Sequence, residues 1–190
     1  MSHGARGSTR APLDRRMTDS MRVATARYVL GDITPESLPA VALQEVLRGG
    51  DSTSLAALAG AVPADSPSEL RELFESALSE LGVHLPSRIQ AAWLLRYEYA
   101  RRVVDGELAA PHGAAEIVDV FRQVDAELPP GGYVGESFGI AQIVGAYYSL
   151  SDIPQDDARA LAELEDSIRE SCARIVAEGP PVGAAETGAV

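Results

Sequence analysis

Three residue patterns have the composition of reactive or metal-binding sites. Residues 135–139 read Gly-Glu-Ser-Phe-Gly, which matches the G-x-S-x-G turn that presents a nucleophilic serine. His112 and Glu116 are four residues apart, a spacing that places both side chains on one face of a helix. Cys172 is the only cysteine. Each pattern has to be judged by whether the chain also supplies the partners that its chemistry needs.

These partners are missing from the sequence. The serine motif works on a strand-to-helix turn with a histidine later in the chain, but no histidine follows Ser137 and no strand pattern precedes it. A metal at the His-Glu pair needs further ligands, and the only other histidines are His3 and His84. Cys172 has no adjacent histidine that would activate its thiol. We therefore predict no catalytic residue, no metal site and no cofactor.

Arg96 is the residue best suited to bind a ligand. It falls between Trp93 and Ala100 on the apolar stripe of a predicted helix, where an unpaired guanidinium would be very costly. One interpretation is a site for an anion or a substrate carboxylate, formed by Arg96 with Tyr97 and Tyr99. The other, which the pattern favours, is a structural ion pair with an acid of a neighbouring helix, or a packed stem with an exposed guanidinium.

The helix that carries Arg96, over residues 86–105, is the predicted centre of the fold. Apolar residues nearly encircle it, which is typical of a helix at the middle of a bundle. It also contains the only Trp and two of the six Tyr, so its burial should contribute strongly to the core. Other helices are predicted near residues 18–30, 34–48, 54–59, 67–81, 111–128, 137–150 and 152–178.

Local signals mark the ends of these helices. Ser66-Pro67-Ser68-Glu69 is a capping box with proline at the first helical position. Glycines follow several predicted helix ends, and Pro129-Pro130-Gly131-Gly132 terminates another. The sequence has no period-2 strand pattern of useful length. The predicted fold class is therefore all-α, a single-domain bundle of about seven or eight helices around the central apolar helix 86–105.

The predicted domain organisation has three parts. Residues 1–16 combine Gly, Ser, Thr, Arg and Pro without periodicity, which predicts a disordered basic head. Residues 17–178 form the single helical domain, and residues 179–190 form a flexible tail. No apolar run is long enough for a membrane span and no secretory signal precedes the domain, so we expect no membrane association. The single cysteine suits the reducing cytoplasm, where we expect the protein to reside.

The charge is unevenly distributed along the chain. The formal net charge is -12, but residues 1–30 hold six arginines against Asp14 and Asp19, or +4, which leaves -16 for the rest. An acidic body repels nucleic acid and anionic lipid and favours a basic protein partner. The helix 152–178 has an acidic outer face, which we interpret first as a solvated surface and second as a docking strip for such a partner.

Three sequence blocks resemble those of one protein family. They are LQEVLRGGDSTSLAALAG, LFESALSELGVHLP and WLLRYEYARRVVDGEL, within a resemblance that covers roughly residues 25–178. The family consists of small, uncharacterised bacterial all-helical proteins with no assigned activity. The shared motifs are structural, namely glycine stops, proline caps and leucine stripes. The resemblance therefore implies an all-helical bacterial protein and transfers no functional residue.

Three functional hypotheses follow. The first is a non-catalytic, acidic protein-protein interaction protein of accessory or immunity type, which binds a basic partner; a homodimer is also compatible with this class. The second is an enzyme or small-molecule binder with a cleft beside Arg96, Tyr97 and Tyr99. The third and weakest is a DNA-linked regulator that uses the basic head, since the sequence shows no recognition-helix pattern.

Overall fold

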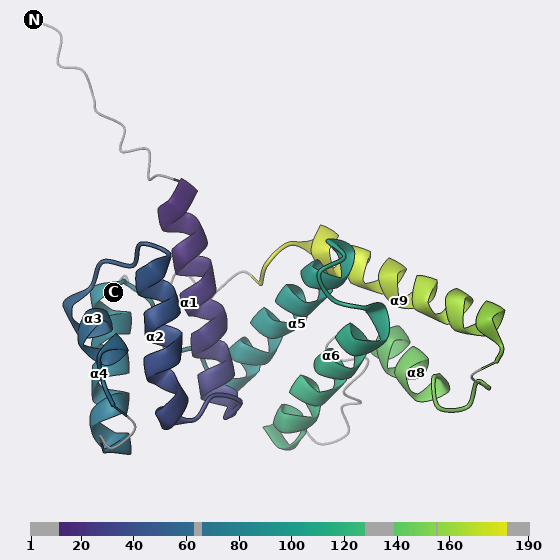
Figure 1. Ribbon diagram of the computed structural model, residues 1–190. Helices are drawn as coiled ribbons and strands as arrows, with labels where there is room; N and C mark the ends of the chain where they lie inside the picture. The colour runs from purple at the N-terminus through teal and green to yellow at the C-terminus, as the bar shows by residue number, and fades with distance from the viewer. Residues whose placement is uncertain (1–11, 63–65, 128–138, 155, 182–190) are drawn as a thin grey trace, which may run out of the picture. The chain divides into compact units, whose positions relative to one another are not determined.

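All the regular secondary structure described for this chain is helical. The computed structural model describes residues 12–62, 66–127, 139–154 and 156–181, and only the backbone for residues 12–19. Within these ranges it contains eight α-helices, two 3₁₀ helices and no strand, which confirms the predicted all-α class (Figure 1). The chain divides into two compact units, residues 1–25 with 33–85 and residues 26–32 with 86–190. The domain limits predicted at residues 16 and 178 stay predictions.

Unit 1 consists of helices joined by short connections. Its elements are the first part of α1 (Pro12–Leu30), η1 (Pro35–Ser37), α2 (Leu38–Leu47), α3 (Thr53–Ala59) and α4 (Pro67–Glu80). The helix α3 packs against both α2 and α4. Phe74 and Met21 are the largest fully buried side chains of this unit, with Leu38, Leu55, Leu58, Leu70 and Leu78 around them. The leucine stripe of α4 therefore faces a core, as its helical spacing predicts.

Polar caps fix the helix ends of unit 1. The predicted capping box at Ser66 is confirmed, since its hydroxyl accepts from the Ser68 amide and its own amide donates to Glu69. Ser52 caps α3 by accepting from the Leu55 amide. The carboxylate of Glu80, at the end of α4, also reaches this cap and accepts from both Ser52 Oγ and Ser54 Oγ at 2.6 Å. The last residue of α4 thus places a negative charge at the N-terminus of α3, where the helix dipole favours it.

Unit 2 contains the predicted central helix. Its elements are the last turn of α1, then α5 (Arg88–Val104), α6 (Ala110–Val124), η2 (Asp125–Glu127), α8 (Ala141–Ser149) and α9 (Ala158–Glu178). The helix α5 packs against α6 and α9, and α8 packs against the same two helices. Within unit 2, α6 and α9 each pack against three α-helices and α5 packs against two, so these contacts do not place α5 at the centre of the unit, as its apolar sequence predicts.

The burial along α5 differs from the expectation in two places. Leu95 is fully buried, whereas Trp93 is only half-buried and meets the buried Phe121 ring edge-on at 6.3 Å between centroids. Val104, one of the apolar residues of this helix, is 45% exposed, since it is the last residue of the helix and the chain turns at Gly106. The core of α5 is therefore built on Leu95 and small alanines, with Trp93 at its margin.

Arg88 joins three helix ends within unit 2. Its guanidinium donates to the Val29 carbonyl at the end of α1 and to the Gln123 carbonyl at the end of α6. It also pairs with Glu127 at 2.6 Å. The last carbonyls of a helix have no partner within the helix, so one planar side chain here satisfies two helix ends at once. Ser87, just before it, forms a second capping box with Gln90.

Several helix boundaries differ from the predicted ones, among them the starts of three helices. The helix α1 begins at Pro12, so residues 12–16 are helical although the sequence placed them in a disordered head; proline suits a first helical turn. The helix α8 begins at Ala141, after Gly139 in the left-handed region. The helix α9 begins at Ala158 because Asp157 accepts from the Ala160 amide and acts as the cap. Pro154, which is within the predicted range 152–178, lies outside the helix.

Gly113 of α6 allows the close approach of α5. A Cβ atom at this position would lie 2.1 Å from Val103 Cγ2, whereas a Cβ at Gly145 of α8 would meet nothing within 4 Å. We predict that Gly113→Ala destabilises the protein by about 1–3 kcal/mol, because two packed helices must separate. Gly145→Ala, the control, should be neutral or stabilise by about 0.5–1 kcal/mol. Urea unfolding measures both, and similar effects of the two variants would contradict the packing assigned to Gly113.

The hydrogen bonds to Glu80 predict a dependence of stability on pH. The hydroxyls of Ser52 and Ser54 lower the pKa of this carboxyl from 4.5 to about 2. A pKa lowered by folding stabilises the folded state above pH 4.5, and this contribution is lost as the pH falls toward 2. The unfolding free energy of Glu80→Gln should therefore lie below that of the wild type at pH 6 and approach it at low pH. Glu72→Gln, on the same helix, is the control; the same pH dependence there would contradict this assignment.

Candidate functional site

Arg96 is buried and paired with an acid from the last helix. The residue is 4% exposed, and its terminal nitrogen donates to Glu178 Oε2 at 2.9 Å. The Glu178 side chain is 59% exposed, so the pair joins a buried cation to a solvated anion. The Nε atom of Arg96 is also buried and has no hydrogen-bond partner among the described residues. One donor of this guanidinium is therefore satisfied by the fold and another is left open.

The other neighbours of Arg96 are an aromatic ring, a thiol and a glycine. The guanidinium carbon lies 4.9 Å from the centre of the Trp93 ring, a cation–π geometry. Burial raises the pKa of the Cys172 thiol to about 11, and the positive charge of Arg96 opposes this shift only in part. Cys172 is therefore a protonated, buried thiol at neutral pH, as the sequence predicts. A Cβ at Gly139 would lie 3.3 Å from the guanidinium, so this residue approaches it closely.

The two tyrosines predicted beside Arg96 have different surroundings. Tyr99 is buried, and burial together with the negative charge of Glu116 raises the pKa of its phenol to about 12. Its other charged neighbours are Arg27 and Asp32, from the end of α1 and the turn after it. Tyr97 is half-buried. The structure thus places Arg96 toward α9 and the Tyr99 phenol toward α6 and the end of α1, and the ligand role of the three residues stays a prediction.

The remaining sequence candidates have these positions. His112 and Glu116 are both exposed on α6, and Glu116 interacts with the Tyr99 phenol. Ser137 lies outside the described residues, and so do Gly135, Glu136 and Phe138 of the same motif. Gly139 is described. Within the described ranges, no three His, Cys, Asp or Glu side chains gather in an arrangement suited to a metal ion.

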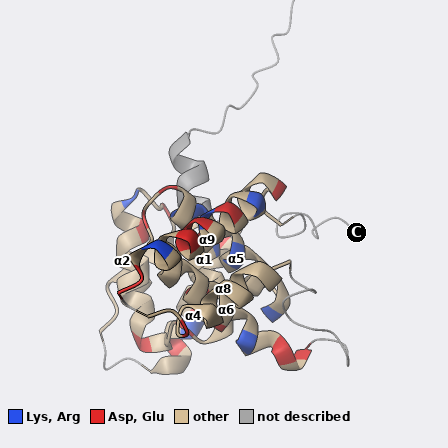
Figure 2. Ribbon diagram, turned by 90° about the vertical axis from the view of Figure 1, so that its right-hand side faces the viewer, with Lys and Arg blue, Asp and Glu red and all other residues tan. Residues whose placement is uncertain are grey.

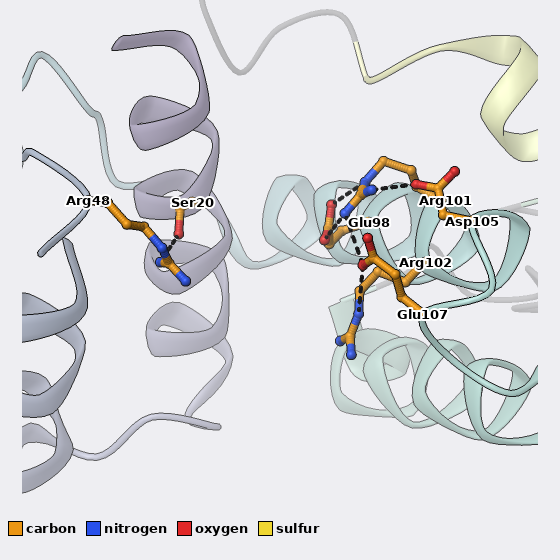
Figure 3. Close-up of polar contacts among 7 residues, drawn as sticks. All are labelled: Ser20, Arg48, Glu98, Arg101, Arg102, Asp105 and Glu107. Carbon is orange, nitrogen blue, oxygen red and sulfur yellow. Dashed lines mark hydrogen bonds and ion pairs between the residues drawn. The ribbon is translucent and has the colours of Figure 1, made fainter. Parts of the chain in front are cut away.

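Glu45 of α2 is a buried acid that the sequence analysis overlooked. It is 1% exposed, and its Oε1 atom accepts from Ser20 Oγ at 2.6 Å and from Arg48. Arg48 also donates to Ser20 Oγ at 2.8 Å (Figure 3). Glu45, Ser20 and Arg48 therefore all bind one another. The Oε2 atom has no partner among the described residues. The spacing of Leu38, Ala42 and Glu45 is the signal that could have placed this acid on the inner face.

The acids of unit 2 are extensively paired with its arginines. Arg101 holds Glu98 with two donors and also binds Asp105, and Glu107 lies near both Arg101 and Arg102 (Figure 3). Red and blue segments follow one another along α9 (Figure 2). The pairs on that helix are Arg159–Glu163, Arg169–Glu165 and Arg169–Asp166. The acidic face of α9, predicted as a solvated surface, is therefore largely compensated by its own arginines.

The acids of residues 33–85, one of the two segments of unit 1, are not paired in this way. Across the described part of residues 33–85, the one ion pair joins Arg48 to the buried Glu45. The sequence of this segment holds eight Asp and Glu against two Arg. Its exposed acids are Glu36, Asp51, Glu69, Glu72, Glu75 and Glu80. Local hydrogen bonds and the charge of Arg71 lower the pKa of Glu36, so it is ionised at neutral pH.

The comparisons with known proteins identify no relative. Neither a family model, nor a curated protein, nor a solved structure matches this chain. The resemblance to a family of small bacterial all-helical proteins therefore stays a prediction. None of the described helices has the length and the apolar content that crossing a bilayer requires.

The Arg96–Glu178 pair gives an asymmetric prediction. Glu178→Ala should cost about 1.5–3 kcal/mol, because it leaves a buried guanidinium with a second unsatisfied donor. Arg96→Met should cost less, because it removes the buried charge and returns an already exposed carboxylate to water. Glu170→Ala, an exposed acid of the same helix, is the control. Chemical unfolding measures all three, and a larger loss in Arg96→Met than in Glu178→Ala would show that Arg96 acts through its packing on Trp93.

Proposed function

We propose that this protein is a non-catalytic helical interaction protein, of accessory or immunity type, that binds a basic protein partner through unit 1. The observation that carries the proposal is the set of exposed, unpaired acids of residues 33–85. Negative charge that is not neutralised within the molecule attracts and orients a positively charged partner, and it raises the association rate.

The distribution of ion pairs supports unit 1 over the acidic helix α9. Docking on α9 would have to break Arg159–Glu163 and both pairs of Arg169 before a partner could replace them. The exposed glutamates of α4, Glu72 and Glu75, have no arginine that must be displaced within the described residues. A basic partner therefore gains more from unit 1 for the same number of contacts.

A second candidate function is the binding of a small carboxylate or another anion beside Arg96. The observation that favours it is the buried Nε atom of Arg96 without an acceptor. The pairing of the same guanidinium with Glu178 favours a structural role instead. Arg96→Met separates the two candidates, because it should leave the capture of a basic partner unchanged and abolish anion binding.

Affinity capture with matched charge variants tests the proposed function. The full chain is immobilised, and bound proteins from the native cell are identified by mass spectrometry at about 0.1 M and about 0.5 M salt. The expected partner is basic and elutes at the higher salt. Glu72→Gln combined with Glu75→Gln should weaken its binding roughly fivefold, since each exposed charge pair contributes a fraction of a kcal/mol to about 1 kcal/mol.

The control removes the same net charge from unit 2. Glu163→Gln combined with Glu170→Gln neutralises two exposed acids of α9 and should leave the partner bound. Equal weakening in both double variants would indicate attraction by net charge alone and would contradict a specific surface on unit 1. A captured partner that is acidic, or that resists the higher salt, would contradict the electrostatic basis of the proposal.

A further inference from the structure

Helix α2 presents an apolar ridge to solvent. Leu47 is 77% exposed and Leu43 is 49% exposed, and Ala40 is exposed on the same side. Positions 40, 43 and 47 have the spacing i, i+3 and i+7, which aligns them along one face of a helix. We call these three residues the α2 ridge. Single exposed leucines are common on protein surfaces, but neighbouring exposed leucines on one helix are typical of an interaction site.

The opposite face of α2 fixes the ridge in its exposed position. Leu38 and Ala42 are buried in the core of unit 1. Glu45, on the same side, is held by Ser20 and Arg48. The helix cannot rotate to bury Leu43 and Leu47 without exposing Leu38 and breaking the contacts of a buried carboxylate. Solvent exposure of the ridge is therefore a stable property of unit 1.

The charge around the ridge indicates what covers it. Glu36, which is ionised at neutral pH, precedes α2. Arg48, directly after Leu47, is paired with the buried Glu45, and the exposed Asp51 follows it. Glu36 and Asp51 belong to the segment 33–85, with its eight acids and two arginines. A second copy that docked through the same ridge would bring like charges together on this surface, which costs free energy. A helix with leucine-type residues on one face and arginine or lysine at both ends has the complementary chemistry.

We propose that the α2 ridge is the docking surface for an amphipathic helix of a basic partner protein. The apolar face of that helix packs on Leu43 and Leu47, and its cationic ends pair with Glu36 and Asp51. This inference rests on the proposed function and adds the binding surface and the secondary structure of the partner segment. In this inference the two leucines supply most of the binding free energy, and the two acids set the orientation of the bound helix.

Designed peptides test the ridge directly. The probe is a helical peptide of about 18 residues, roughly five turns, with leucines at positions i, i+3 and i+7 and arginines at both ends. One matched peptide replaces the arginines by glutamates, and another replaces the leucines by serines. Fluorescence anisotropy with the full chain should detect binding of the first peptide and at least tenfold weaker binding of both others.

Variants of the chain give the second arm of the experiment. Leu43→Gln combined with Leu47→Gln should weaken binding of the arginine–leucine peptide at least tenfold. Glutamine keeps helix propensity and both sites are exposed, so circular dichroism should show an unchanged fold. Val104→Gln, an exposed apolar position of α5, is the control and should bind as the wild type does. Equal binding by the double variant and the wild type would overturn the ridge as the docking surface.

Two further outcomes separate this inference from the proposed function. If the serine peptide binds as well as the leucine peptide, while Glu72→Gln with Glu75→Gln still loses the cellular partner, the ridge is wrong and the acidic surface remains. Sedimentation of the full chain tests whether a second copy of the chain covers the ridge instead. A dimer that dissociates in the Leu43→Gln and Leu47→Gln variant would show that a second copy covers the ridge, and it would overturn the assignment to a basic partner.

Discussion

The buried carboxylate of Glu45 is the constraint on which the exposed surface of unit 1 depends. An acid inside a helical core is tolerated only when its oxygens find donors, and here Ser20 and Arg48 supply them to one of the two oxygens. The second oxygen has no partner among the described residues, which costs about 1–3 kcal/mol, as much as a typical point mutation. Because these contacts hold Glu45 on the inner side, they fix the orientation of α2 about its own axis, and Leu43 and Leu47 therefore remain exposed to solvent.

The two units use their charges in different ways. In unit 2 arginines neutralise acids within the same helix or join helix ends, as Arg101 does at the end of α5 and Arg88 does between α1 and α6. In unit 1 the only exposed arginines in the described part of residues 33–85 are Arg48 and Arg71. The acids of residues 33–85 therefore outnumber the arginines of the same segment, and most of them carry charge that a basic partner can pair with.

Arg96 illustrates how a residue with functional chemistry can be used for structure. Its position among apolar residues of α5 demands a partner, and the partner comes from the last turn of α9, 82 residues later. Trp93 covers one face of the guanidinium. The positive charge of Arg96 lowers the pKa of the buried Cys172 thiol and so opposes part of the rise that burial causes. The arrangement links α5 to the end of α9, and it leaves the buried Nε atom without an acceptor among the described residues. This open donor keeps anion binding as the second candidate function.

The sequence by itself determined the helices and most of their ends, because capping boxes, glycine stops and apolar periodicity act over a few residues; Ser66, Gly31 and Gly82 lie where those signals place them. It also determined the acidic character of the chain. Only the tertiary structure decided that Glu178 pairs with Arg96, that Ser20 binds Glu45 and that several acids of α9 pair with its arginines. Those contacts depend on how each helix is rotated and which helix it meets, and residues far apart in the chain settle both.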